Sequence, residues 1–289
     1  MSAKWLILGS SGQVGAELIK ICENKELDYC ALGRNELDIT NFQNVMNCMS
    51  ELRPKYVVNC AAWTAVDAAE EFRDKAFSTN VLGPKNIAKS CVKFGSILFQ
   101  ISTNYVFEGN TNSINNEFSK KNPINYYGLS KLNGEEMALR YNPNATIIIR
   151  SASIYGLNGK NFALTILENI SKQKLLKVIE DQFVQPTWSK DLADRIITLA
   201  KNEISTGTYH AVNSGSTNWY VFAKKLISKL QLDYRYLSKS VMSDLNFVAP
   251  RPVAAIMQQN EWQKIGFNSL PSWEDALDRA SAEMKGLVF

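Results

Sequence analysis

Tyr127 and Lys131 stand four residues apart in the sequence, and on a helix this spacing puts both side chains on one face. Reduction of a carbonyl needs a proton at the oxygen as a hydride reaches the carbon. A free tyrosine has a pKa of about 10, so we expect the lysine ammonium to lower the tyrosine pKa toward neutrality. Tyr126 has a serine at the corresponding spacing, which leaves Tyr127 as the candidate acid. The pair predicts carbonyl reduction by a nicotinamide cofactor, with Lys131 also bonded to the nicotinamide ribose.

A hydroxyl at the end of an apolar run is the third candidate for this chemistry. Thr103 follows the apolar segment 97–101, where it can polarise a substrate carbonyl beside Tyr127; the alternative is that it only ends a strand. Asn80 can hold a proton-relay water next to the cofactor, or it can fill a kink in a helix. We therefore expect Thr103, Tyr127 and Lys131 to form the catalytic set.

A glycine-rich segment, GSSGQVG, follows the first apolar run at residues 9–15. Its spacing is GxxGxxG rather than GxGxxG, but it stands between a predicted strand and a predicted helix, which is the context that a dinucleotide site needs. Glycines let the backbone approach a pyrophosphate, and the start of the helix offers free N–H groups to that anion. The expected cofactor contacts in this segment are Gly9, Ser11, Gly12, Gln13, Val14 and Gly15.

We expect the residue at the end of the second predicted strand to contact the adenine ribose of the cofactor. Arg34 stands there and no carboxylate does. An acidic residue at this point favours NAD, whereas an arginine pairs with the 2′-phosphate of NADP, so we expect NADPH, with NADH as the alternative. Arg34 can also be a simple loop charge or stack on the adenine. Asp38 and Ile39 are expected at the adenine edge, although Asp38 can instead belong to a turn.

Composition excludes several other chemistries. The chain has 289 residues, 45% of them hydrophobic, and a net charge of +4, which is ordinary for a globular protein and too mild for a nucleic-acid partner. His210 is the only histidine, so we expect no metal site built on histidines.

Five cysteines without a CxxC pattern predict reduced residues of a cytoplasmic protein. We expect no membrane partner, since the apolar stretch 56–66 is too short, and no signal peptide, since an apolar strand begins directly after residues 1–3.

Short apolar runs alternate with amphipathic stretches along the chain. Strands are predicted at 5–8, 29–32, 56–60, 97–101, 146–149 and 208–212, and helices at 12–23, 41–52, 75–94, 127–140, 161–172, 191–201, 220–230 and 273–285. Thr40 is the expected N-cap of the second helix, and Gly83 with Pro84 is expected to kink the third. This alternation predicts an α/β fold: a doubly wound, Rossmann-like parallel sheet with a smaller C-terminal substrate lobe.

The alternation of short apolar runs and amphipathic stretches becomes less regular after Arg150, which suggests where the domains divide. We expect residues 1–151 and 181–213 to form an NAD(P)-binding domain. Residues 152–180 and 214–289 are expected to form a substrate-binding lobe over the carboxyl ends of the strands, where such sheets bind ligands.

With these motifs in order, the chain resembles the extended short-chain dehydrogenase/reductases and, more narrowly, the dTDP-4-dehydrorhamnose reductases. The matching segments cover about two thirds of the chain: 9–15, 52–54, 58–62, 64–67, 102–109, 127–135, 181–182 and 186–187. The resemblance implies reduction of the 4-keto group of a nucleotide-activated 6-deoxyhexose, such as dTDP-4-dehydrorhamnose to dTDP-L-rhamnose, in the synthesis of surface polysaccharide precursors. Thr103, Tyr127 and Lys131 fall on the catalytic triad of that family.

The resemblance also implies further residues that contact the cofactor or the substrate. It puts Cys60, Ala61 and Ala62 beside the cofactor. It puts Thr64, Val66, Asn104, Tyr105, Ser153 and Arg251 on the substrate side, with Arg251 available for a diphosphate.

Four positions depart from the family pattern, and all lie on the substrate side. Asn104 replaces an aspartate, Ser153 stands where a tryptophan packs on the sugar, and Val184 replaces a glycine. The residues after Arg251 also differ from the family's Asn-Ser, since Val253-Ala254-Ala255 follows Arg251-Pro252. The pattern favours a reductase with an altered sugar pocket: a rhamnose enzyme that has drifted, or one for another 4-keto sugar or nucleotide.

Two other functions remain open from the sequence. One is an epimerase or dehydratase with tightly held NAD, although dehydratases carry an Asp-Glu pair after the strand-end threonine and this chain has Asn104-Tyr105. The other is a non-catalytic nucleotide-binding regulatory subunit, which the complete triad argues against. A homodimer is the default assembly for such a chain.

Overall fold

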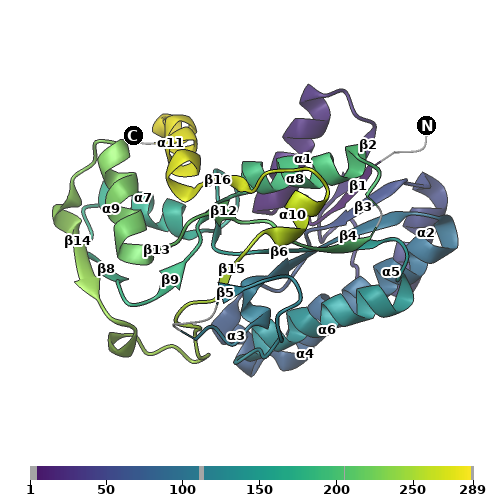
Figure 1. Ribbon diagram of the computed structural model, residues 1–289, viewed down its shortest axis with the longest axis horizontal. Helices are drawn as coiled ribbons and strands as arrows, with labels where there is room; N and C mark the ends of the chain where they lie inside the picture. Colours follow the sequence, from purple (N-terminus) through teal and green to yellow (C-terminus); the bar gives the residue numbers. More distant parts are fainter. Residues whose placement is uncertain (1–4, 111–113, 205, 288–289) are drawn as a thin grey trace.

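A six-stranded parallel sheet forms the centre of the protein (Figure 1). The computed structural model describes residues 5–110, 114–204 and 206–287. The strands follow the order β2-β1-β3-β4-β6-β11, and every neighbouring pair is parallel. Their bounds are Trp5–Leu8 (β1), Tyr29–Leu32 (β2), Tyr56–Asn59 (β3), Ile97–Thr103 (β4), Thr146–Ser151 (β6) and Gly207–His210 (β11). The predicted doubly wound α/β fold is confirmed.

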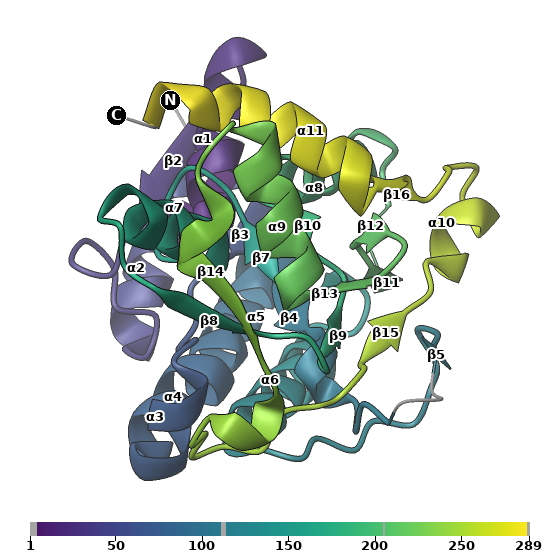
Figure 2. The same ribbon diagram turned by 90° about the vertical axis from the view of Figure 1, so that its left-hand side faces the viewer.

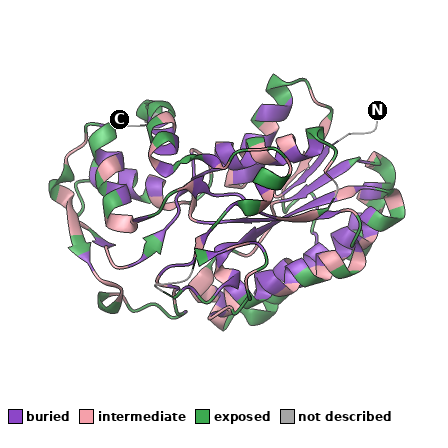
Figure 3. Cartoon of the chain, viewed as in Figure 1, coloured by how far each residue is buried: buried purple, intermediate pink, exposed green. Residues whose placement is uncertain are grey.

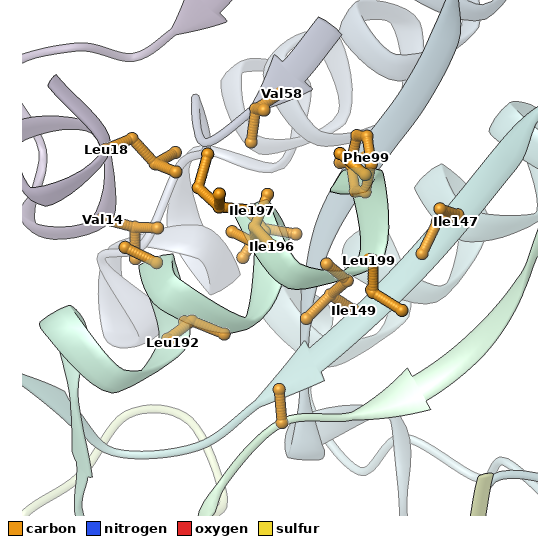
Figure 4. Close-up of a cluster of buried hydrophobic side chains, with 14 of the residues drawn as sticks. Val14, Leu18, Val58, Phe99, Ile147, Ile149, Leu192, Ile196, Ile197 and Leu199 are labelled. Carbon is orange, nitrogen blue, oxygen red and sulfur yellow. The ribbon is translucent and has the colours of Figure 1, made fainter. Parts of the chain in front are cut away.

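Helices cover both faces of this sheet, as its apolar strands require. One face carries α1 (Gln13–Asn24) and α8 (Ser189–Lys201), and the other carries α2 (Phe42–Leu52), α5 (Gly83–Phe94) and α6 (Tyr126–Tyr141) (Figure 1). Residues alternate along each strand between the two faces, so that Val58 and Ile149 pack under α1 and α8 while Val57 and Ile148 pack under the other helices. Figure 4 shows the first of these two clusters, where side chains of α8 meet those of the sheet.

Two predicted local features differ from the structure. The N-cap of α2 is Asn41, whose side chain accepts from Asn44 N at 3.1 Å, because the helix begins at Phe42, one residue later than predicted. The single helix predicted at 75–94 consists of α4 (Arg73–Phe77), a π-helical turn (Ser78–Leu82) and α5. Since Pro84 has no N–H, the regular hydrogen-bond ladder cannot pass through it, and the chain widens there.

A second group of helices lies beyond the carboxyl ends of the sheet strands (Figures 1 and 2). It consists of α7 (Phe162–Ser171), α9 (Trp219–Lys229) and α11 (Trp273–Met284), with the parallel strands β8 (Leu176–Ile179) and β14 (Leu237–Ser240). These helices share their own cluster of buried side chains, including Phe222 and Trp273. Figure 3 shows that each of these helices is buried on its inner side and exposed on its outer side.

Short elements complete the chain. The helices α3 and α10 are Val66–Glu71 and Asn260–Lys264. Two-residue or three-residue strands pair as β5 (Ile114–Asn115) with β15 (Ile256–Met257), β7 (Ile154–Tyr155) with β10 (Thr187–Trp188), β9 (Phe183–Val184) with β13 (Thr217–Asn218), and β12 (Asn213–Ser214) with β16 (Leu270–Ser272). Within the described ranges, no helix is long and apolar enough to cross a membrane. The same part of the chain contains no group of three His, Cys, Asp or Glu residues that could hold a metal ion.

Candidate active site

The glycine loop between β1 and α1 is shaped by close backbone contacts. Gly9 has φ +77°, and a Cβ there would lie 2.6 Å from the Ala61 nitrogen; a Cβ on Gly15 would lie 2.5 Å from the Gly9 oxygen. Gly12 is the N-cap of α1 and makes no side-chain capping bond. The first N–H groups of α1 are therefore offered to a ligand rather than to a capping side chain, as in anion sites at helix starts.

Two cavities adjoin at this loop and together form one groove. The first, of about 330 Å³, runs along the ends of β1 and β2, and the second, of about 280 Å³, leads from the loop to α6. Both share Gly12, Cys60 and Ala62. The predicted cofactor residues that line the groove are Gly9, Ser11, Gly12, Gln13, Val14, Arg34, Asp38, Ile39, Cys60, Ala61, Ala62, Tyr127 and Lys131. A groove with the phosphate loop at its middle fits a dinucleotide, with one nucleoside on each side.

Two of the predicted cofactor residues lie outside the groove. Gly15 packs against the backbone of Gly9 and Ser10 and lines neither cavity. The Asn80 amide accepts from Trp63 N at 2.8 Å and donates to Trp63 O at 3.1 Å and Ser130 Oγ at 2.9 Å. These bonds tie the π-helical turn to the loop after β3 and to α6, so the structure gives Asn80 a bracing role, and the expected relay water has no support in them.

Tyr127 and Lys131 line the second cavity, and Thr103 lies next to it. Thr103 is the last residue of β4; its hydroxyl accepts from Tyr105 N at 3.2 Å and lies close enough to Tyr127 to lower the pKa of that phenol. Lys131 lies one turn further along α6 and donates to Ile101 O at 2.7 Å. Asn125 caps this helix by accepting from Gly128 N at 2.8 Å, which fixes the turn that carries Tyr127. The geometry is that of a proton donor beside a second hydroxyl at the wall of a cavity.

The pKa values correct one expectation. Burial raises the pKa of Tyr127 to about 12; the nearby Thr103 hydroxyl opposes this shift and the neighbouring Tyr105 adds to it. Lys131 has no part in the shift, and its ammonium points to the Ile101 carbonyl. Burial lowers the pKa of Lys131 to about 8, against the influence of Glu135 and Cys60. Tyr127 is thus a fully protonated phenol at neutral pH, which suits a group that must give a proton.

The predicted substrate residues fall into different positions around the second cavity. Thr64 lines it, and Val66 begins the neighbouring α3. Tyr105 packs edge-on against Tyr127 with ring centroids 5.6 Å apart. Ser153 lines neither cavity and has φ +47°.

Asn104 and Arg251 both contact the segment before β15. The buried Asn104 amide donates to Ala255 O at 3.2 Å. Arg251 forms an ion pair with Asp67 at 2.7 Å and donates to Ala249 O at 3.0 Å. The guanidinium expected to hold a diphosphate therefore bridges α3 to this segment across the site.

The match to known proteins decides the family. The family model described as RmlD substrate binding domain matches residues 3–285. The chain belongs to this family. It is 35% identical over 287 residues to a dTDP-4-dehydrorhamnose reductase of Streptomyces griseus, covering 98% of this chain and 94% of the relative.

Two further relatives of this RmlD-family chain extend the comparison. It is 35% identical over 280 residues to a probable dTDP-4,6-dihydroxy-2-methyloxan-3-one 4-ketoreductase of Streptomyces antibioticus, covering 96% of this chain and 94% of that one. The crystal structure of dTDP-4-dehydrorhamnose reductase from Bacillus anthracis in complex with NADP has 35% identity and a TM-score of 0.93, over 98% of this chain and all of that one. The named relatives are ketoreductases that act on dTDP-sugars.

The RmlD-family chain also holds groups near the site that the sequence motifs did not reveal. Glu36 is one of them: a turn after β2 brings its Oε2 to 2.5 Å from Gly33 N, so a carboxylate does stand at the end of β2. Asp67, the partner of Arg251, and Gln182, which lies close enough to Tyr105 to lower the pKa of that phenol, are two more. Asp67 and Gln182 belong to the matching segments 64–67 and 181–182, but only the fold shows which residues they contact.

A buried ion pair lies under the catalytic side chains. Arg150 binds Glu135 with two hydrogen bonds, of 2.9 Å from Nε and 2.7 Å from the terminal nitrogen, and Ser102 donates to the same carboxylate. Both charged side chains are at most 3% exposed. The pair joins α6 to β4 and β6 directly beside Thr103 and Lys131, and thereby fixes their relative positions.

Glu135→Ala should lower the free energy of unfolding by about 3–5 kcal/mol, because it leaves the Arg150 charge buried and unpaired. Urea denaturation of the purified protein measures this. Glu136→Ala is the matched control, since Glu136 is exposed on the same helix and should change stability by no more than about 0.5 kcal/mol. Equal effects of the two substitutions would contradict the interpretation.

Proposed function

We propose that this protein reduces the 4-keto group of a nucleotide-activated 6-deoxyhexose with NADPH, most specifically dTDP-4-dehydrorhamnose to dTDP-L-rhamnose or a close variant, for polysaccharide precursors. The observation that carries the proposal is the placement of Tyr127 and Lys131 at the wall of a cavity that continues into the glycine-loop cavity, with the Thr103 hydroxyl at the end of β4 close to Tyr127. The relatives named as dTDP-sugar ketoreductases support the substrate class.

The residues of the groove fit the proposed cofactor. Gly9 and Gly15 let the loop pack closely on the neighbouring backbone, and the start of α1 offers N–H groups to a diphosphate. Arg34 lines the first cavity and supplies a positive charge for a 2′-phosphate. When bound, the reduced nicotinamide supplies the hydride for the reaction.

The chain's own residues would handle the proton and the orientation of the ketone. Tyr127 gives its phenolic proton to the keto oxygen, and the Thr103 hydroxyl holds that oxygen in place. Lys131, with a pKa of about 8, is mostly an ammonium at neutral pH and would hold the nicotinamide ribose from the wall of the cavity that Tyr127 also lines. The ketone must approach the hydride donor to roughly 3–3.5 Å for reaction.

The direct test is turnover of dTDP-4-dehydrorhamnose by the purified protein, followed by loss of NADPH absorbance and by identification of the sugar product. Formation of dTDP-L-rhamnose supports the proposal in full, and another 6-deoxy sugar supports the close variant. Purified protein that carries stoichiometric NAD and epimerises a sugar nucleotide would contradict it, as would stable binding of a partner enzyme without turnover of any keto sugar.

Glu36→Gln should shift the cofactor preference toward NADPH. The Glu36 carboxylate lies at the end of β2, where it can accept from a ribose hydroxyl but repels a 2′-phosphate. Its neutral replacement should lower the KM for NADPH about threefold to tenfold, which corresponds to about 1 kcal/mol, and should not improve the KM for NADH. Steady-state kinetics with both cofactors measure the ratio. Glu51→Gln, on the exposed side of α2, is the control, and an unchanged ratio in Glu36→Gln would be evidence against the assignment.

We further propose how the protein is organised. Residues 1–151 with 181–213 would bind the cofactor, and 152–180 with 214–289 would bind the substrate. The separate buried cluster of α7, α9 and α11 supports this division, while Trp262 and Leu270 of the second set pack in the cluster of the sheet. All five cysteines are free thiols, which suits the reducing cytoplasm. A homodimer is the proposed assembly, and light scattering of the purified protein tests it.

A further inference from the structure

We propose that Lys160, on the loop between β7 and α7, binds the diphosphate of the dinucleotide cofactor from the side opposite the glycine loop. The inference rests on the proposed use of NADPH and extends it to a residue outside the sheet and its motifs. Lys160 lines the second cavity together with Gly12, Gln13 and Val14, the residues at which α1 begins.

The loop that carries Lys160 is packed directly on the start of α1. Gly159 has φ +67°, and a Cβ there would lie 3.3 Å from the Gln13 Cγ and 3.6 Å from the Gln13 nitrogen. The Asn158 amide donates to Glu17 Oε1 at 3.2 Å, one turn further along α1. The residue that follows Gly159 must therefore emerge next to the first turn of α1.

The same loop is also fixed at its other end, so the position of Lys160 is defined. The Asn161 amide donates to Gly156 O at 2.9 Å, and its oxygen accepts from Leu164 N at 3.1 Å as the N-cap of α7. One asparagine thus closes the loop and begins the next helix. Lys160 itself is exposed, so its side chain is available to a ligand in the groove.

The distribution of positive charges along the groove indicates that Lys160 would neutralise the diphosphate. A dinucleotide diphosphate carries about two negative charges, whereas a helix start supplies only about half a positive charge. Among the described residues that line the two cavities, the other cations lie elsewhere: Arg34 and Lys75 in the first cavity, and Lys131 bonded to the Ile101 carbonyl. Lys160 is the cation that lines the groove beside the residues at which α1 begins.

An unpaired polar atom lies at the same point. The Gln13 Oε1 is buried and has no hydrogen-bond partner in the described part of the chain. Gln13 also lines the second cavity with Lys160. A buried acceptor without a partner is costly, and an ammonium drawn into the groove by a bound diphosphate can satisfy it while neutralising the phosphate charge.

The test compares the binding of three ligands to the intact protein by titration calorimetry: NADPH, ADP-ribose and 2′-AMP. Lys160→Gln should weaken NADPH and ADP-ribose about tenfold, the value for one charged hydrogen bond at an exposed site. It should change 2′-AMP less than about twofold, because that ligand has no diphosphate. Lys160→Arg should retain most of the affinity, and Lys224→Gln, an exposed lysine on α9, should leave all three ligands unchanged.

Other results would overturn the inference. Undiminished NADPH binding by Lys160→Gln removes Lys160 from the cofactor site. An equal loss for 2′-AMP would mean that the substitution disturbs the whole groove, and an equal loss in Lys160→Arg would mean that charge is not what matters. Failure of the unmodified protein to bind NADPH would instead contradict the proposed function, so the two failures are distinguishable.

Discussion

Tyr127→Phe should lower the turnover number for the keto sugar by about 10³-fold or more while leaving NADPH binding within about twofold. The substitution removes the hydroxyl that gives its proton to the keto oxygen, and a positioned general acid contributes about 10²–10⁴-fold. The ring stays, so its packing against Tyr105 and the shape of the cavity are retained. Steady-state turnover and the dissociation constant for NADPH measure the two effects separately.

The matched control is Tyr126→Phe, which makes the same change on the preceding residue. Tyr126 faces Arg73, with the guanidinium 5.0 Å from its ring centroid, and does not line the second cavity. Its turnover should stay within about twofold. If Tyr127→Phe kept full activity, another group would have to supply the proton and Tyr127 would leave the mechanism.

Local patterns were sufficient to predict the sheet, the glycine loop between β1 and α1, and the positions of Thr103 and Tyr127 at a strand end and a helix start. The strands are short and apolar, and each functional motif stands at a strand end or a helix start that its own neighbours define. Thr103 ends β4 and Tyr127 begins α6, and their meeting follows once both are put at the same edge of a parallel sheet. Such features are encoded within a few residues of the motif.

Features that depend on contacts between distant segments could not be predicted in this way. The sequence does not reveal that Arg251 is paired with Asp67, 184 residues away. It also does not reveal that the Asn80 side-chain amide is hydrogen-bonded to Trp63 and Ser130. The turn that returns Glu36 to the end of β2 is closer in sequence, but no pattern marks where its carboxylate points.

The pKa of Tyr127 is another property that the sequence pattern alone could not predict. The spacing of Tyr127 and Lys131 predicts that they share a helix face, but the pKa depends on burial and on where the ammonium points. Burial dominates for both side chains and acts in opposite directions, since it disfavours the phenolate and the ammonium alike.

This burial leads to the second large effect: Lys131→Met should remove most of the activity and stabilise the protein. We expect turnover to fall about 10²-fold, since the cavity loses the ammonium that would hold the nicotinamide ribose in place beside Tyr127. The pKa of Lys131 falls from 10.5 to about 8 on folding, so keeping its ammonium in the fold costs about 3 kcal/mol at neutral pH. Loss of the charged bond to Ile101 O costs about 1.5 kcal/mol, which leaves a net gain of about 1–2 kcal/mol.

The pH dependence identifies the source of that gain. Below a pH of about 8 the lysine is charged in both states and the whole cost is present; between about 8 and 10.5 the unfolded chain binds a proton that the folded chain has released. The free energy of unfolding of the unmodified protein should therefore rise relative to Lys131→Met across this window. Urea denaturation at about pH 7 and pH 10 measures the difference, with Lys224→Met as the control. A gap that stays constant with pH would show that packing, and not the buried charge, separates the two proteins.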